Sequence, residues 1–133
     1  MQKMQIISTD QAPVAIGPYS QAVVYQGIVY SSGQIALSPE TGELVGLSAE
    51  EQAKQCLSNL GHVLQAAGAN KQTILKVVIF LRSMADFAAV NAVYESWLGM
   101  HRPARSTVAV LDLPRNALVE IECVAYSATI CAT

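Results

Sequence analysis

Short runs of alternating hydrophobic and polar residues in this chain have the two-residue period of β-strands. Residues 5–9, 22–26 and 28–32 are the first three such runs, and Gly27 between the last two indicates a hairpin. Residues 73–81 are the most apolar run, and such a strand requires cover on both faces. In a regular strand they divide into Leu75, Val77, Ile79 and Leu81 on one face, and Ile74, Lys76, Val78 and Phe80 on the other.

In two longer segments the apolar residues recur every three to four positions, which predicts amphipathic helices. The first covers residues 48–68, where Ser48 and Glu51 form a capping box and Gly68 gives the C-terminal stop. Its apolar stripe is interpreted as core, and consists of Ala53, Leu57, Leu60, Leu64 and Ala67. The second helix covers residues 84–98 and ends at Gly99, with Phe87, Val90, Tyr94 and Trp97 at helical spacing.

Two more strand-like runs lie near the C-terminus, at residues 104–110 and from residue 119 onwards, and each carries charge within apolar sequence. Arg105 and Thr107 share one face of the first run, and Glu120 and Glu122 share one face of the second. Because a charge buried alone is costly, Arg105 and Glu120 each need a partner, water or a ligand.

The simplest arrangement is a salt bridge between Arg105 and Glu120. A hairpin that turns within residues 113–117 would instead leave the two groups about five residues apart, roughly 16 Å along the strands. Either the last strand pairs elsewhere in the sheet, or the two groups serve something other than each other.

The order of elements predicts a single α+β domain over residues 1–133, with a mixed six-stranded sheet and two helices on one face. Residues 73–81, the second helix and residues 104–110 form a βαβ unit. A last strand placed between earlier ones gives a split βαβ, chorismate-mutase-like topology. Since two helices cover only one face, the apolar second face predicts a homo-oligomer.

Composition and charge narrow the classes of partner. Hydrophobic residues make up 52% of the 133 residues and charged residues 14%, with a net charge of −2. The absence of a basic cluster argues against nucleic acid, and no run approaches the ~20 apolar residues of a membrane span. Three scattered cysteines and two isolated histidines argue against a metal site. We expect a cytoplasmic protein with no export signal, and a frayed end over residues 128–133.

Several motifs, in order along almost the whole chain, resemble the RidA family of small enamine and imine deaminases. They are Pro-Ala-Arg-Ser at 103–106 and Val-Glu-Ile-Glu at 119–122, preceded by residues 16–22, 32–35 and 87–91. The resemblance implies a homotrimer with sites between subunits. It also implies a hydrolase that needs no cofactor or metal.

The resemblance assigns the main chemistry to two residues. Arg105 matches the arginine that holds the substrate carboxylate, for which a guanidinium offers two parallel donors. Glu120 matches the glutamate that positions or activates the attacking water, and Glu122 has no assigned task.

Four further residues match positions around the family's ligand. Gly33 corresponds to a glycine whose backbone approaches the ligand, and Tyr19 to a tyrosine that lines the pocket. Asn91 corresponds to a residue near the site. Thr107 stands where several relatives have cysteine, which excludes thiol catalysis at this position but leaves a hydroxyl that can bind a ligand.

The leading hypothesis is hydrolytic deamination of reactive 2-imino and 2-enamino acids, such as 2-aminoacrylate and 2-iminopropanoate, to 2-keto acids and ammonia. Such an activity limits metabolite damage. The alternative is a non-catalytic protein that binds or senses small carboxylates, in which Glu120 is structural. A translation-inhibiting ribonuclease or a chaperone-like protein ranks last, because the chain has no basic or aromatic-interleaved patch.

Overall fold

The structure, a computed structural model, describes residues 3–128. Cys131 and residues 129–133 of the predicted frayed end lie outside the described residues. The elements are β1 (Gln5–Ile7), β2 (Ala22–Tyr25), β3 (Ile28–Ser31), α1 (Ala49–Ala66), β4 (Ile74–Leu81), α2 (Phe87–Leu98), β5 (Ala104–Ala109) and β6 (Val119–Tyr126). Single 3₁₀ turns lie at Lys71–Thr73, Met84–Asp86 and Pro114–Asn116.

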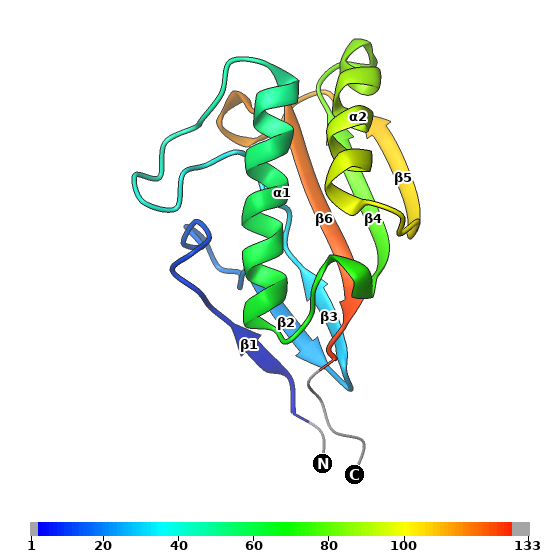
Figure 1. The fold of residues 1–133 in the computed structure, drawn as a ribbon. Helices are drawn as coiled ribbons and strands as arrows, with labels where there is room; N and C mark the ends of the chain where they lie inside the picture. Colours follow the sequence, from blue (N-terminus) through cyan, green and yellow to red (C-terminus); the bar gives the residue numbers. More distant parts are fainter. Residues whose placement is uncertain (1–2, 129–133) are drawn as a thin grey trace.

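The six strands form one mixed sheet in the order β1-β2-β3-β6-β4-β5. β4 and β5 are parallel neighbours joined through α2, and β6 lies antiparallel between β3 and β4 (Figure 1). The α+β prediction with two helices and an inserted last strand is therefore confirmed. β5 and β6 do not form a hairpin, because β4 separates them.

Local sequence signals place the ends of α1 as expected. The Ser48 side chain accepts a hydrogen bond from the Glu51 backbone N–H, and the Ser48 backbone N–H donates in return to Oε1 of Glu51 at 3.3 Å. Gly68 adopts a φ of 76°, and the next N–H, of Ala69, donates to the carbonyl of Leu64 at 2.8 Å. This C-terminal motif needs a left-handed residue, which glycine provides without strain.

The turn between β2 and β3 follows the same logic. Gln26 and Gly27 have φ values of 52° and 80°, and Tyr25 pairs with Ile28 across them. A two-residue loop with both angles positive is the tight hairpin turn that matches the twist of the flanking strands.

One prediction about β4 is wrong, because the strand contains a bulge. Ile74 pairs with Ala125 and Lys76 with Val124, so Leu75 is an extra residue that has no pairing partner on β6. The bulge turns Ile74 into the core, where it is 1% exposed, and leaves Leu75 45% exposed. The two residues thus exchange the faces that strict alternation assigns to them.

The second helix also begins later than predicted. Residues Met84–Asp86 form a 3₁₀ turn, with the Ser83 side chain accepting from the Ala85 backbone, before α2 starts at Phe87. The predicted end at Gly99 is correct, with a φ of 70°.

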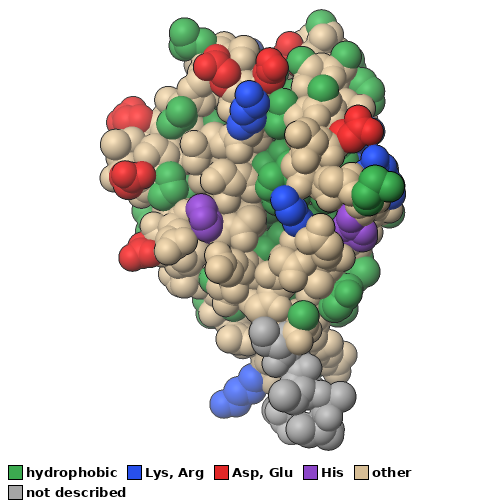
Figure 2. Space-filling view, viewed as in Figure 1, with side chains coloured by type: hydrophobic (Ala, Val, Ile, Leu, Met, Phe, Trp, Pro, Cys, Tyr) green, Lys and Arg blue, Asp and Glu red, His purple; other side chains and the backbone are tan. Residues whose placement is uncertain are grey.

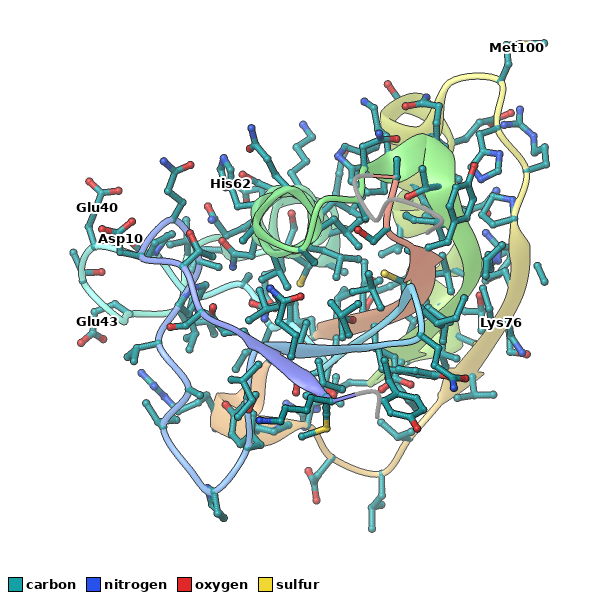
Figure 3. All side chains as sticks on the ribbon, turned by 90° about the horizontal axis from the view of Figure 1, so that it is seen from below. Asp10, Glu40, Glu43, His62, Lys76 and Met100 are labelled. Carbon is teal, nitrogen blue, oxygen red and sulfur yellow. The ribbon has the colours of Figure 1, made fainter. Side chains whose placement is uncertain are left out.

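The two faces of the sheet differ in cover. Both helices pack on one face and enclose the core, and no helix in residues 3–128 covers the other face (Figures 1 and 3). We call this second side the open face. Apolar side chains dominate it: Ile6, Val23, Tyr30, Val78, Phe80, Val108 and Val124.

The helix side of the molecule shows no concentration of positive charge. In Figure 2 the Lys and Arg side chains are scattered over this face, Asp and Glu lie mainly at its upper end and left edge, and hydrophobic side chains lie between the two helices. No helix within residues 3–128 is long and apolar enough to cross a membrane.

Candidate active site

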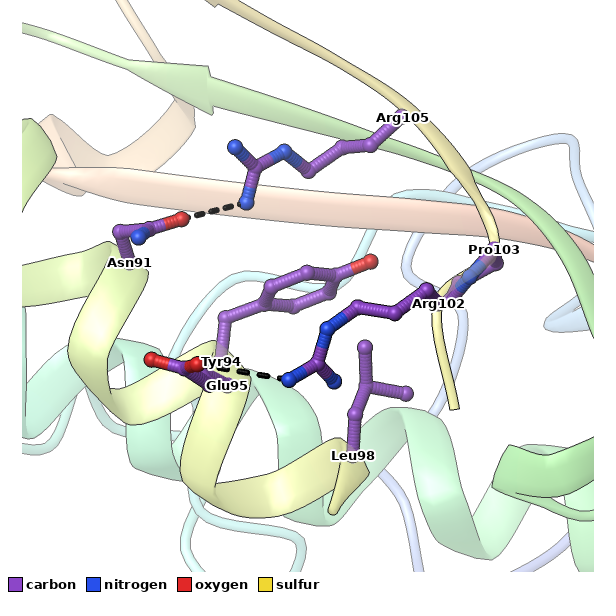
Figure 4. Close-up of a pocket in the computed structure, with 7 residues that line it drawn as sticks. All are labelled: Asn91, Tyr94, Glu95, Leu98, Arg102, Pro103 and Arg105. Carbon is purple, nitrogen blue, oxygen red and sulfur yellow. Dashed lines mark hydrogen bonds and ion pairs between the residues drawn. The ribbon is translucent and has the colours of Figure 1, made fainter. Parts of the chain in front are cut away.

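Arg105 lies on edge strand β5, beneath α2. It pairs with Val77 of β4, so its side chain is on the helix-covered face. Its Nη1 donates to Oδ1 of Asn91 at 2.6 Å. The guanidinium carbon also lies 5.6 Å from the ring centre of Phe87 and 5.1 Å from that of Tyr94. Three residues of one helix therefore hold the guanidinium, and Figure 4 shows two of them, Asn91 and Tyr94, beside it.

A hollow of about 360 Å³ adjoins this guanidinium. The second cation there, Arg102, is 3.3 Å from the Glu95 carboxylate. Arg105, in contrast, has no carboxylate within salt-bridge distance among residues 3–128, and its Nε and Nη2 have no hydrogen-bond partner there. A cation with free, coplanar donors beside a hollow is suited to bind a carboxylate. The hollow is lined by Asn91, Tyr94, Glu95, Leu98, Arg102, Pro103 and Arg105.

The Tyr94 ring remains an uncharged phenol beside this cation. Burial raises the pKa of Tyr94 above its ordinary value, although the charges of Arg105 and Arg102 oppose the shift. The side chain as a whole is 6% exposed. A neutral aromatic face, negative at its centre, stabilises a cation placed over it.

Thr107 lies two residues beyond Arg105 on the same face of β5. Its hydroxyl oxygen is buried and has no hydrogen-bond partner in residues 3–128. A buried hydroxyl without a partner is costly, so this group is available to a ligand or a water molecule.

Glu120 belongs to a second, separate hollow of about 100 Å³. It pairs with Phe80 of β4, three residues from Val77, and so it points to the open face. Tyr19, 51% exposed, lies on the wall of this hollow. The remaining lining residues are Pro13, Val14, Ile16, Gly33, Gln34, Ile35, Leu37, Pro114 and Arg115.

Gly33 provides the space for the Glu120 carboxylate. A Cβ at this position would lie 2.7 Å from the carboxyl carbon of Glu120 and closer still to Oε2. No real Cβ tolerates such contacts, so glycine is required for this side-chain position. The structure thus assigns Gly33 a contact with Glu120 in addition to the ligand contact implied by the resemblance.

The Glu120 carboxylate is half-buried, and no Lys or Arg among residues 3–128 forms an ion pair with it. Burial, and secondly the charge of Glu122, raise the pKa of Glu120 above the ordinary value of 4.5. No hydrogen bond from residues 3–128 reaches this carboxylate, and the nearby Arg115 pairs with Glu43 at 4.0 Å. A raised pKa makes the ionised carboxylate a stronger base than an exposed one.

A buried amide holds the loop that walls this hollow. Gln21, 4% exposed, accepts from the Thr9 backbone N–H at 2.7 Å and donates to the carbonyl of Pro13 at 2.8 Å. On the other side, Gln34 and Ile121 exchange backbone hydrogen bonds of 2.8 and 3.0 Å. The loop and strand around Glu120 are therefore fixed by polar contacts rather than by a helix.

The candidate residues thus divide into two clusters. Arg105, Asn91 and Thr107 lie on the helix-covered face, and Tyr19, Gly33 and Glu120 lie together at the other hollow. A direct Arg105–Glu120 salt bridge is excluded, because the two side chains leave opposite faces of the sheet on either side of β4.

Sequence reasoning missed the aromatic contacts of Arg105. The sequence places Phe87 and Tyr94 only at helical spacing along the second helix, and the useful signal is their distance of four and three residues from Asn91. Gln21 was also missed, although it lies inside the motif at 16–22.

Thiol and metal chemistry find no support in the described part of the chain. Cys56 and Cys123 are buried, and burial raises both pKa values, that of Cys123 to about 12. Neither thiol is a nucleophile at neutral pH. Within residues 3–128 no group of three His, Cys, Asp or Glu side chains is arranged to hold a metal ion.

Comparison with known proteins gives consistent matches. The family described as Endoribonuclease L-PSP matches residues 9–127. A 2-iminobutanoate/2-iminopropanoate deaminase of Mus musculus is 46% identical over 121 residues, 91% of this chain and 90% of the mouse protein. Reactive Intermediate Deaminase A of Arabidopsis thaliana is 46% identical over 92% of this chain, which spans 66% of that chloroplastic protein. The crystal structure of E. coli TdcF with bound serine is 39% identical, with a TM-score of 0.87 over 92% of this chain and 98% of TdcF.

Proposed function

The chain belongs to the RidA family, described also as Endoribonuclease L-PSP, and we propose that it hydrolyses reactive 2-imino and 2-enamino acids to 2-keto acids and ammonia. The observation that carries the proposal is a complementary pair of unsatisfied charges. Among residues 3–128, Arg105 has N–H donors without a partner and no carboxylate within salt-bridge distance, and Glu120 has a raised pKa and no cation paired with it. Relatives about 45% identical carry the deaminase name, which supports the same reaction class.

Each group then has a defined task. Arg105 binds the substrate carboxylate through two N–H donors and so fixes the position of the neighbouring imine carbon. Glu120 accepts a proton from a water molecule whose oxygen attacks that carbon. The proton that Glu120 took from water returns to the imine nitrogen, which gives a carbinolamine. The proton of its new hydroxyl then passes to the amine as the carbon–nitrogen bond breaks, so that ammonia leaves and the carbonyl of the 2-keto acid remains. A 2-enamino acid enters the same sequence after it takes a proton at C3, loses one from nitrogen and becomes the imine.

We further propose that the complete site forms between subunits of a homotrimer. A single small substrate cannot reach both faces of one sheet, so Arg105 of one copy and Glu120 of another must share it. The apolar open face, which contains Glu120, is the surface that a second copy would cover. The serine bound by TdcF, a small amino acid with a carboxylate, supports a ligand of this size.

The direct test generates 2-aminoacrylate from serine with a dehydratase and follows the formation of pyruvate. Wild-type protein should accelerate the conversion, and Arg105→Ala should remove the acceleration. Arg82→Ala is the matched control, because Arg82 carries the same charge, pairs with Asp112 at 3.9 Å and lines neither hollow. No acceleration by assembled wild-type protein would reject the deaminase proposal for this substrate.

The alternative of a carboxylate sensor makes a different prediction. A sensor would bind 2-keto acids through Arg105 without turnover in the wild type. The ribonuclease name of the family suggests a third assay, cleavage of RNA, for which the dispersed charge of the helix side gives no support (Figure 2).

A further inference from the structure

We propose that Phe87, Asn91 and Tyr94 form a bracket on α2 that fixes the Arg105 guanidinium, so that a substrate carboxylate binds side-on to Nε and Nη2. Phe87 and Tyr94 are then positioning residues, which act on the substrate through Arg105. The inference rests on the proposed function, since it gives the orientation of the same carboxylate.

The bracket has the spacing of one helical face. Phe87, Asn91 and Tyr94 are four and three residues apart, so their side chains follow one another along α2 above β5. All three contact the same guanidinium: Asn91 through a 2.6 Å hydrogen bond, and the rings at 5.6 and 5.1 Å from its central carbon. A helix and a strand, rather than a loop, therefore hold the cation.

The bracket leaves one edge of the guanidinium free. Asn91 occupies Nη1, and Nε and Nη2 have no hydrogen-bond partner in residues 3–128. Figure 4 shows the terminal nitrogen that does not contact Asn91 pointing away from Tyr94. Of the four N–H groups that remain, Nε–H and one Nη2–H are parallel and match the two oxygens of a carboxylate.

Fixing the side chain in advance strengthens ligand binding. A free arginine side chain samples many rotamers, and part of this conformational entropy is lost when it binds a ligand. The two rings and the amide restrict the guanidinium before the substrate arrives, so less entropy is lost on binding. The cation–π contacts contribute to this restriction, because each ring face attracts the guanidinium.

Binding of a stable product tests the bracket separately from catalysis. We would measure the affinity for 2-oxobutanoate by calorimetry in wild-type protein, Tyr94→Leu and Phe87→Leu. Each leucine keeps apolar volume but removes the ring, and affinity should fall about three- to tenfold. Tyr94→Phe keeps the ring and should restore affinity to within about twofold of wild type.

One further measurement and one control variant distinguish a positioning role of Phe87 and Tyr94 from a general disturbance of the fold. The Nε–H resonance of Arg105 should move and broaden in the leucine variants without ligand, as the guanidinium gains freedom. Trp97→Leu is the matched control: Trp97 is another aromatic of α2, but its ring contacts Lys71 at 5.5 Å and not Arg105. This control should leave both the affinity and the Arg105 resonance unchanged.

The outcomes distinguish the inference from its premise. Wild-type affinity in both Tyr94→Leu and Phe87→Leu, with loss in Arg105→Ala, would overturn the bracket and leave the carboxylate site intact. No binding by wild-type protein, or equal binding by Arg105→Ala, would overturn the proposed function itself. If Tyr94→Leu does not fold, Phe87→Leu still tests whether the bracket affects affinity, because Phe87 is less buried than Tyr94.

Discussion

The surroundings of Arg105 and of Glu120 are built in opposite ways. Arg105 is held by three side chains of one helix, through a hydrogen bond and two aromatic rings. Glu120 occupies a space left by a missing Cβ at Gly33, with no hydrogen bond to its carboxylate among the contacts of residues 3–128. A binding group gains from contacts that fix its direction, whereas a base gains from incomplete solvation.

The elements that carry the two groups differ as well. The Arg105 cluster stands on α2 and β5, where regular backbone hydrogen bonds set each side chain. The Glu120 hollow is walled by a loop that the buried Gln21 amide fastens through Thr9 and Pro13. The first cluster therefore depends on side-chain packing, and the second depends on the course of the backbone.

The largest expected effect distinguishes Glu120, the proposed base, from Arg105, the proposed carboxylate-binding group. Glu120→Gln should lower kcat by about 10²–10⁴, because an amide cannot accept the proton of water. Affinity for 2-oxobutanoate should stay near that of wild type, since Arg105 is unchanged. Glu122→Gln is the control, as Glu122 shares the face but does not line the hollow. Equal kcat in Glu120→Gln and wild type would remove Glu120 from the chemistry.

Mixing two inactive variants tests whether the groups meet between copies. Arg105→Ala and Glu120→Gln subunits, unfolded together in equal amounts and reassembled, should regain about a quarter of wild-type activity, because one interface in four joins two intact groups. Each variant reassembled alone should stay inactive. Mixed assemblies without any recovery would show that the groups do not act across a subunit boundary.

A methyl group added at position 33 should disturb the Glu120 hollow and leave the Arg105 cluster unchanged. Gly33→Ala places a Cβ against the Glu120 carboxylate, so that side chain must move, and we expect kcat to fall about tenfold or more. The Nε–H resonance of Arg105 should not change. Unaltered turnover in Gly33→Ala would mean that the position of the Glu120 carboxylate is not critical.

The smallest effect concerns pH. Activity should fall as pH decreases through the raised pKa of Glu120, because the protonated acid cannot act as a base. Glu122→Gln removes a charge that raises this pKa, so the acid limb should move to lower pH. A limb that stays in place would exclude Glu122 as an influence on the base.

The raised pKa of Glu120 also predicts how the stability of the folded protein changes with pH. A carboxyl group whose pKa is higher in the folded state binds more protons there than in the unfolded chain, so its contribution to stability falls as pH rises through that pKa. Glu120→Gln should therefore raise Tm slightly at neutral pH. The gain should disappear at a pH below the unfolded value, where both forms are uncharged.

Local signals in the sequence determined much of this protein. The capping box of Ser48 and Glu51, the stop at Gly68 and the turn at Gly27 depend on neighbouring residues alone, and the structure has them where the sequence places them. The turn also includes Gln26, which the sequence assigns to the preceding strand. The motifs around Arg105 and Glu120 likewise identified the family, because motif order does not depend on how the strands pair.

Only the tertiary structure decided how these parts face one another. The bulge at Leu75 has no signature in the alternation, since Ile74 and Leu75 are both apolar and either could be buried. The place of β6 between β3 and β4 depends on pairing between strands distant in the chain. That pairing puts Arg105 and Glu120 on opposite faces, because a two-residue period fixes the faces within one strand but not between strands.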